Sequence, residues 1–222
     1  MREEWLEERR KGIGASEAGA ACGISPWKTP YSLYLEKRGE AAPEPENEAM
    51  RWGTALEPII RQRYADETGR SVRLVKTLQS EKYPFMFASP DGEIDSEHGL
   101  EVKTARSDIG WGEPGTAEIP EHYLCQVQHQ MIVVGYVVVD VAALIGGSDF
   151  RIYEVPADPE LQQLIIDREA AFWEMVKAGT PPDPTTFADL KQRFGAVSKA
   201  QTVQASPEAM EAIARLKEIK AL

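Results

Sequence analysis

The sequence is poor in cysteine. Its two cysteines, Cys22 and Cys125, stand in no paired motif. Two cysteines exclude a disulfide-rich scaffold and an iron–sulfur cluster held by four thiolates. We expect a reduced, cytoplasmic setting, because that is where unpaired cysteines are usual.

Long apolar runs are also missing, since no eighteen consecutive residues are apolar. The longest such stretch, residues 131–146, is interrupted by Gly135 and Asp140 and is typical of a buried strand. A membrane span needs about 20 apolar residues. The first residues, "MREEWLEERRKG", are charged and lack an apolar segment, so we expect neither a secretory signal nor a membrane partner.

Positive charge is scarce, with 25 Lys and Arg against 36 Asp and Glu and a formal net charge of −11. This balance excludes sequence-blind nucleic-acid binding over a broad surface. It leaves a local basic groove possible, because binding depends on where the charges lie.

With 222 residues and 42% hydrophobic content, the chain fits one large domain with or without a short appendage. Helical periodicity and end signals predict helices near 16–22, 29–39, 50–69, 120–135, 158–179 and 206–222. Strands are predicted over 71–80, 85–95, 99–105, 136–147 and 150–157. This order predicts an α/β or α+β domain whose central mixed β-sheet is flanked by helices.

Three local details refine these helices. Ser16 is the expected N-cap of the short helix at 16–22. Pro58 lies inside the 50–69 pattern and predicts a kink or a restarted helix there. Residues 180–195 are rich in proline and predict an irregular arm.

The stretch "SPDGEIDSEHGLEVK" (89–103) carries two acids and a lysine in an expected hairpin. The hairpin would bring Asp91 close to Glu101, and the two-residue period places Glu101 and Lys103 on one face of the strand. Two close carboxylates repel unless a cation joins them, and oxygen ligands favour Mg²⁺ or Mn²⁺. A nearby lysine suits metal-assisted phosphodiester hydrolysis, because it can hold the attacking water or stabilise charge at the phosphate.

Spacing alone leaves a plainer interpretation open, in which these residues form a solvated hairpin face with a cross-strand Glu–Lys pair. Glu57, Gln126 and Gln128, taken singly, are equally compatible with helix surfaces. Arg9, Arg10 and Ser16 form either a phosphate site at a helix start or ordinary surface polarity. His122, Cys125 and His129 share one helix face but make a poor tetrahedral zinc site, since a fourth ligand is not evident.

Five motifs occur in one order: "RRKGIGASE", "RWGTALE", "SPDG", "GLEVK" and "YLCQVQ". Together, over roughly residues 5–175, they resemble the lambda-type phage exonucleases, or YqaJ-type viral recombinase family, of the PD-(D/E)XK nuclease superfamily. The resemblance implies a restriction-endonuclease-like fold. It also implies an exonuclease domain over 1–179. Residues 180–222, which composition predicts to be a Pro-rich arm and a C-terminal helix, have no match in the resemblance.

The resemblance also implies roles for individual residues. The metal ligands would be Asp91, Glu101, the carbonyl of Val102, and Glu57. Lys103 would be the catalytic lysine, supported by Gln126, with Gln128 the weaker choice. Arg9 and Ser16 would bind a terminal 5′-phosphate, with Arg10 as the alternative to Arg9. The remaining acids of the hairpin are predicted to be ordinary tip residues: Glu93, Asp95 and Glu97.

The implied activity is Mg²⁺-dependent degradation of one strand of linear duplex DNA from its 5′ end, with Mn²⁺ as a substitute metal. The implied partners are DNA ends, further copies of the chain in a ring-shaped trimer, and a single-strand annealing protein in phage-type recombination. The setting would be a bacterial host or prophage. An end-independent endonuclease of the same fold and a non-catalytic DNA-binding scaffold remain alternatives.

Overall fold

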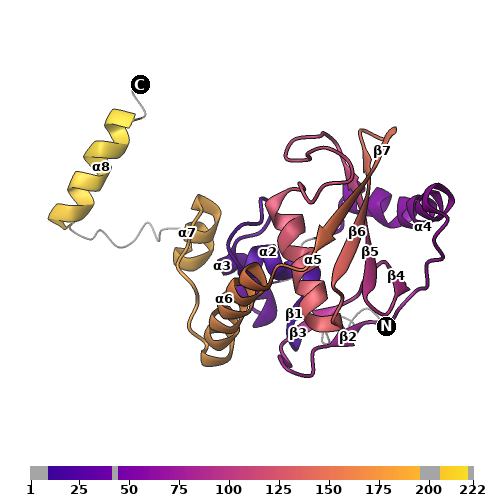
Figure 1. Cartoon of the computed structure of the whole chain (residues 1–222). Coiled ribbons are helices and arrows are strands. Elements are labelled where there is room, and N and C mark those ends of the chain that lie inside the picture. Colours follow the sequence, from indigo (N-terminus) through magenta and orange to yellow (C-terminus); the bar gives the residue numbers. More distant parts are fainter. Residues whose placement is uncertain (1–9, 42–44, 196–205, 220–222) are drawn as a thin grey trace.

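The computed structural model describes residues 10–41, 45–195 and 206–219 (Figure 1). Its elements, in chain order, are β1 (Ile13–Gly14), η1 (Ala15–Glu17), α2 (Ala18–Ala21), α3 (Pro30–Lys37), α4 (Glu48–Thr68), β2 (Leu78–Gln79), β3 (Met86–Ala88), β4 (Gly92–Asp95), β5 (His98–Ala105), α5 (Glu121–Val134), β6 (Val138–Ile145), β7 (Asp149–Pro156), α6 (Pro159–Ala178), α7 (Phe187–Phe194) and α8 (Pro207–Ile219).

The strands form two small mixed sheets, ordered β1-β3-β2 and β4-β5-β6-β7. In the second sheet β5 and β6 run parallel, joined by α5, while β4 and β7 are antiparallel edge strands. The expected mixed α/β architecture is confirmed. The strand expected over 85–95 is wrong in one respect, because it divides between the two sheets at residues 89–91. Only Leu78–Gln79 of the expected strand 71–80 forms a strand.

Helices cover both faces of the four-stranded sheet (Figure 1). On one face α4 packs Ile60 and Tyr64 against Leu100 and Val102 of β5. On the other face α5 contributes Val127 and Met131 to a core with several residues of β6 and β7. Because alternate residues of β5 point to opposite faces, the residues between the core positions of β5 face α5.

Two helix details differ from expectation. The N-cap predicted at Ser16 is wrong, because the helix begins at Ala15 and its N-cap is Gly14. The Gly14 N–H donates to Oε2 of Glu17 at 2.9 Å, so the glutamate caps this turn in place of the serine. The helix containing Pro58 runs from Glu48 to Thr68 without restarting.

The Pro-rich arm contains the helix α7, whereas its composition predicted irregular structure. Thr186 caps α7 by accepting a hydrogen bond from Asp189 N at 3.1 Å. The Asp189 side chain is buried and accepts hydrogen bonds from the hydroxyls of Thr29, at 2.8 Å, and Ser32, at 3.4 Å. These contacts attach the arm to the N-terminus of α3.

The two cysteines are distant in sequence but pack in one core cluster as free thiols. The hydrogen bond of the Cys125 thiol to Cys22, together with burial, raises the pKa of Cys125, so its thiol stays protonated. No helix in the described ranges combines the length and the apolar character needed to cross a membrane.

Candidate active site

The site lies where one edge of β5 is open to side chains. β4 pairs with β5 only from His98 to Leu100, whereas β6 pairs along the whole of β5 on the opposite edge. Beyond Leu100 the open edge meets Asp91, whose Oδ2 accepts a hydrogen bond from Val102 N at 2.8 Å. The N–H and carbonyl of one strand residue point to the same edge. The Val102 carbonyl therefore faces the side occupied by Asp91.

Glu101 and Lys103 share the α5 face, as the two-residue period predicted. Nζ of Lys103 lies 2.5 Å from Oε1 of Glu101 and 3.0 Å from Oε1 of Gln126. The Gln126 amide in turn donates to Oε1 of Glu101 at 2.5 Å. The Glu101 carboxylate is buried, with 2% of its surface exposed. This arrangement rules out the solvated hairpin face, and it brings Gln126 to the lysine.

The sequence interpretation missed Gln130. Its Nε2 donates to the second oxygen of Glu101 at 2.6 Å, and its side chain is buried. Residues four apart share one helix face, so the spacing of Gln126 and Gln130 was an available signal. Gln128 points elsewhere. It donates to Pro156 O and accepts from Asp158 N, which fixes α5 against the start of α6.

Glu57 reaches the site from α4 through an arginine that was also missed. One nitrogen of Arg61 donates to Oε1 of Glu57 at 2.8 Å and to the carbonyl of Asp91 at 2.9 Å. The Glu57 side chain remains 36% exposed. Arg61 thus places Glu57 beside the loop of Asp91 and leaves the carboxylate accessible.

The electrostatics show an excess of negative charge around Asp91. Burial, the charge of Glu101 and, to a smaller extent, that of Glu57 raise the pKa of Asp91 to about 8, although Lys103 and the Val102 N–H oppose the shift. For Lys103, burial works against the charged form, but Glu101 and Asp91 outweigh it and raise its pKa. The lysine therefore stays positively charged. The ionised form of Asp91, by contrast, would be stabilised by a further positive charge close to it.

The donor set fits a hard divalent cation. In the parts of the chain that the structure describes, no three His, Cys, Asp or Glu side chains already converge on one point that could hold a metal. Asp91, Glu101 and the Val102 carbonyl nevertheless offer oxygen donors together with unbalanced negative charge. Mg²⁺ commonly takes only one or two carboxylates and keeps several waters, so a preformed triad is not required.

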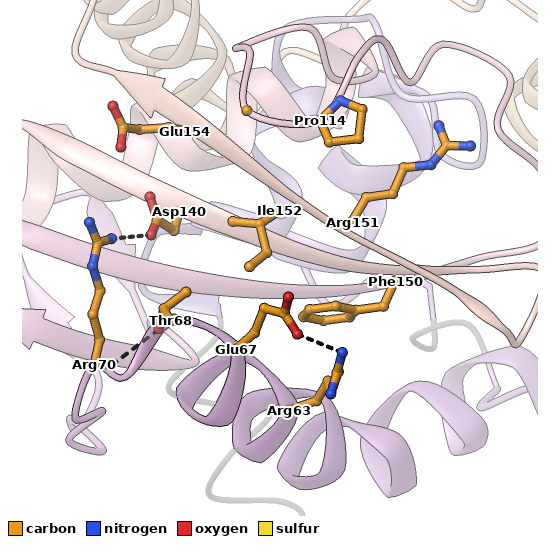
Figure 2. A pocket seen from close by; sticks show the side chains of 11 residues that line it. Arg63, Glu67, Thr68, Arg70, Pro114, Asp140, Phe150, Arg151, Ile152 and Glu154 are labelled. Atoms are coloured by element: carbon orange, nitrogen blue, oxygen red, sulfur yellow. Dashed lines mark hydrogen bonds and ion pairs between the residues drawn. The ribbon is translucent and has the colours of Figure 1, made fainter.

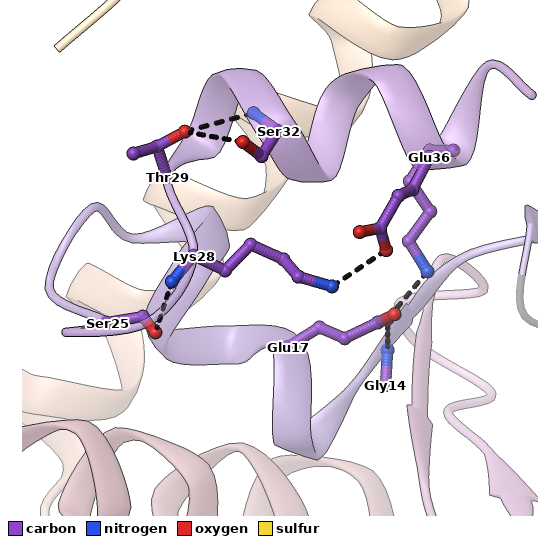
Figure 3. Close-up of polar contacts among 8 residues, drawn as sticks. Gly14, Glu17, Ser25, Lys28, Thr29, Ser32 and Glu36 are labelled. Carbon is purple, nitrogen blue, oxygen red and sulfur yellow. Dashed lines mark hydrogen bonds and ion pairs between the residues drawn. The ribbon is translucent and has the colours of Figure 1, made fainter. Parts of the chain in front are cut away.

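The expected phosphate-binding residues lie near this site only in part. Ser16 is exposed on η1, which lies against α5. Arg10 is exposed, with its guanidinium beside Gly39, and Arg9 falls outside the described residues. The next residue, the buried Glu17, accepts from Gly14 N (Figure 3) and also from Lys37 Nζ at 2.6 Å.

The acids at the hairpin tip have other partners. Glu93 pairs with Arg73 and accepts a hydrogen bond from the Tyr136 hydroxyl at 3.2 Å. Asp95 accepts from Glu97 N at 2.9 Å and is exposed. Glu93 therefore has a structural role, while the effect of all three acids on catalysis remains a prediction.

A cavity of about 610 Å³ lies on the α4 face of the sheet (Figure 2). Its lining includes Arg63 and Arg70, which pair with Glu67 and Asp140, each at 2.5 Å. Figure 2 shows that the Arg63–Glu67 pair lies along α4, whereas the Arg70–Asp140 pair joins the segment after α4 to β6. Because Glu101 and Lys103 face α5, this cavity is separate from the candidate active site.

The sequence and fold both have relatives. Residues 4–137 match the YqaJ-like viral recombinase domain family, and the chain belongs to that family. It is similar to the uncharacterized protein YqaJ of Bacillus subtilis (strain 168), with 39% identity over 203 residues. It is also similar to the uncharacterized protein R354 of Acanthamoeba polyphaga mimivirus, with 27% identity over 143 residues. The aligned parts cover 87% and 59% of this chain but 63% and 26% of those longer proteins.

Solved structures share the fold at low sequence identity. The alkaline exonuclease LHK-Exo of Laribacter hongkongensis aligns with a TM-score of 0.65 and 23% identity, covering 88% of this chain and all of that one. An exonuclease described as putative, from Eubacterium rectale, aligns with a TM-score of 0.63 and 13% identity, covering 89% and 93%. A phage-related exonuclease of Haemophilus somnus 129PT aligns at 0.58 with 10% identity, covering 75% and 94%.

Proposed function

We propose that this chain is a Mg²⁺-dependent exonuclease that hydrolyses one strand of linear double-stranded DNA. The observation that carries the proposal is the cluster at the open edge of β5, where Asp91, Glu101 and Lys103 meet. Exonucleases that share the fold support the same assignment.

The metal would be held by Asp91, Glu101 and the Val102 carbonyl, with Glu57 as a further ligand or as the group that orients a water. Mg²⁺, or Mn²⁺ in its place, supplies an activated water and neutralises charge on the phosphate. Glu57 suits either role because its carboxylate is accessible, and only its ion pair with Arg61 has to break before it can bind a metal or a water.

The chain's own contribution centres on Lys103. Since acids on both sides keep its ammonium charged, the lysine donates hydrogen bonds and stabilises negative charge that develops on the scissile phosphate. Nζ donates to Glu101 and to Gln126, which leaves the ammonium one further donor for the substrate. Gln130 fixes the second oxygen of Glu101, which keeps the carboxylate from rotating.

The polarity is proposed to be 5′ to 3′. Ser16 on η1 and Arg9, or Arg10 in its place, would hold the terminal 5′-phosphate. The position of η1 against α5 supports a terminal phosphate on the same side of the sheet as Lys103.

The test compares linear and circular duplex DNA of one sequence, with Mg²⁺ and with a chelator, for the wild type and Lys103→Ala. We expect Mg²⁺-dependent loss of linear DNA only, and none with Lys103→Ala. Digestion of the circle would indicate an endonuclease, and no digestion of either would indicate a scaffold. Equal rates on 5′-phosphorylated and 5′-hydroxyl ends would contradict the terminal-phosphate site.

Family membership also motivates three wider proposals: a role in phage-type recombination, cooperation with a single-strand annealing protein, and assembly into a ring-shaped trimer. Light scattering tests the last directly. A trimer's mass in dilute solution supports it, and a monomer's mass contradicts it.

A further inference from the structure

An aromatic group beside Lys103 has no part in the chemistry above. Trp27 keeps 66% of its surface exposed, a large value for an indole. Its ring packs edge-on against the ring of His122, with 4.6 Å between the ring centroids. The His122 ring in turn lies 4.1 Å, centroid to centroid, from the ring of Tyr123. These three side chains are called the Trp27 platform below.

The Trp27 platform adjoins the catalytic lysine through Tyr123. The ring of Tyr123 lies 6.0 Å from that of Trp27, and Nζ of Lys103 lies 4.8 Å from the Tyr123 centroid. Burial and the positive charge of Lys103 lower the pKa of His122, so its ring is uncharged at neutral pH. The platform is therefore an uncharged aromatic surface that reaches Lys103 through the ring of Tyr123.

The local fold holds Trp27 in this position. Gly19 of α2 lies against the first turn of α5, where an added Cβ would be in ordinary contact with Cβ of His122 at 3.4 Å. Ser25 Oγ accepts from the N–H groups of Trp27 and Lys28, each at 3.3 Å. Lys28 also pairs with Glu36 of α3 at 2.7 Å (Figure 3). The loop is thus tied to α3, and the exposure of Trp27 is imposed by a fixed backbone.

We propose that the Trp27 platform stacks a nucleobase of the strand being degraded and so sets that strand's position at Lys103. An exposed aromatic beside a phosphate-binding centre suits a nucleobase, because every base has an apolar face and stacking tolerates any sequence. The proposal rests on the proposed function, to which it adds a substrate subsite. Trp27 is a positioning residue, since it touches the substrate away from the reacting atoms.

The test varies both protein and substrate. Linear duplexes with a 5′-phosphate carry one abasic nucleotide at successive positions from the 5′ end, and single-turnover cleavage is measured with Mg²⁺. With wild type, we expect an abasic nucleotide at one position to slow cleavage by roughly 5- to 100-fold, the range that alanine substitution gives for base stacking. Trp27→Ala should be slowed similarly on intact DNA and should ignore the abasic nucleotide. Trp27→Phe should behave nearly as wild type.

A binding readout keeps the platform testable apart from catalysis. DNA carrying 2-aminopurine at the sensitive position, or at each of the first positions in turn, is titrated with protein in Ca²⁺. Stacking on the indole should quench the fluorescence with wild type but not with Trp27→Ala. Phe187→Ala is the matched control, because Phe187 is an 81% exposed aromatic on α7. Circular dichroism should give one melting temperature for all variants.

The outcomes separate the two proposals. Cleavage of intact DNA by Trp27→Ala at the wild-type rate, or equal slowing of wild type and Trp27→Ala by the abasic nucleotide, overturns the platform and leaves the nuclease assignment intact. Quenching that depends on Trp27 without any cleavage supports the platform and overturns the nuclease assignment. Unquenched DNA together with a pulled-down protein partner that Trp27→Ala loses would make the surface a protein-docking site and overturn the proposal.

Discussion

Two buried acids on adjacent strands of one sheet have opposite surroundings. Asp140 of β6, on the α4 face, accepts hydrogen bonds from the Tyr64 hydroxyl and from Arg70 (Figure 2). Glu101 of β5, on the α5 face, meets Lys103 but also shares its site with Asp91. Each acid exposes only 2% of its surface. Burial is therefore the same, and what differs is the charge around each acid.

Asp140 already has a cation beside it, and Nε2 of His98 lies 2.9 Å from its second oxygen. Burial and the hydrogen bond to Asp140 raise the pKa of Tyr64 to about 12, so the phenol remains a donor, and Arg70 supplies the balancing charge. At the Glu101 site, Asp91, Glu101 and Glu57 outnumber Lys103 and Arg61. At the Asp140 site a neighbouring cation offsets the buried acid, whereas clustered acids with too few cations suit the cation site proposed above.

The largest effect is expected for Lys103→Ala. Removing the lysine that is proposed to stabilise charge on the phosphate should lower the cleavage rate by about 100- to 1000-fold. Single-turnover cleavage of linear duplex DNA measures the loss. Lys177→Ala is the control, since Lys177 pairs with Glu174 on the surface of α6. A decrease of less than threefold for Lys103→Ala would contradict its role.

Asp140→Ala should affect stability instead of chemistry. It leaves Tyr64 without its acceptor and Arg70 without its acid, but Arg70 is 40% exposed and regains water. We expect a loss of about 2 kcal/mol in the free energy of unfolding. Urea denaturation measures it, and cleavage per folded molecule should stay near the wild-type value. A loss of cleavage per folded molecule without a loss of stability would mean that Asp140, like Glu101, belongs to the active site.

Gln130→Ala should reduce activity by about tenfold, a smaller effect because Glu101 keeps its contacts with Lys103 and Gln126. Gln128→Ala is the matched control on the same helix. It should lower the melting temperature without a comparable change in the cleavage rate. The reverse ranking of these two variants would contradict the assignment of Gln130 to the site.

Stability without metal should fall as pH rises toward 8. The pKa of Asp91 is about 8 in the folded protein against an ordinary value of 3.8, so the folded state binds the proton more tightly. Between these values the unfolding free energy decreases by at most about 1.4 kcal/mol per pH unit. Melting temperatures from pH 6 to 9 in chelator measure this slope. Asp91→Asn should reduce the pH dependence of the melting temperature. An unchanged slope in that variant would mean that another titrating group causes the pH dependence.

The smallest effects are expected at the hairpin tip. Asp95→Ala should change the cleavage rate by less than twofold, because its side chain is exposed and accepts a hydrogen bond from the Glu97 backbone at the hairpin tip. The same assay measures it. A tenfold decrease in the cleavage rate would mean that the active site includes the hairpin tip as well as the open edge of β5.

The sequence predicted many of the features that local signals control, although the local N-cap at Ser16 was wrong and α7 was missed. Alternation in β5 placed Glu101 and Lys103 on one face, and Asp158 with Pro159 marked the start of α6. The break between β3 and β4 at residues 89–91 escaped prediction, because only tertiary pairing separates two sheets. Arg61 and Gln130 were missed for a related reason: their partners, Asp91 and Glu101, come from other elements.

Metal binding tests the contrast between the two acids most directly. Mn²⁺ is titrated into wild type, Asp91→Asn and Asp140→Asn at pH 8 and followed by electron paramagnetic resonance. Wild type and Asp140→Asn should bind Mn²⁺, displaceable by Mg²⁺, and Asp91→Asn should lose that binding. Equal binding by wild type and Asp91→Asn, or no binding by wild type, would contradict a cation site at the open edge of β5.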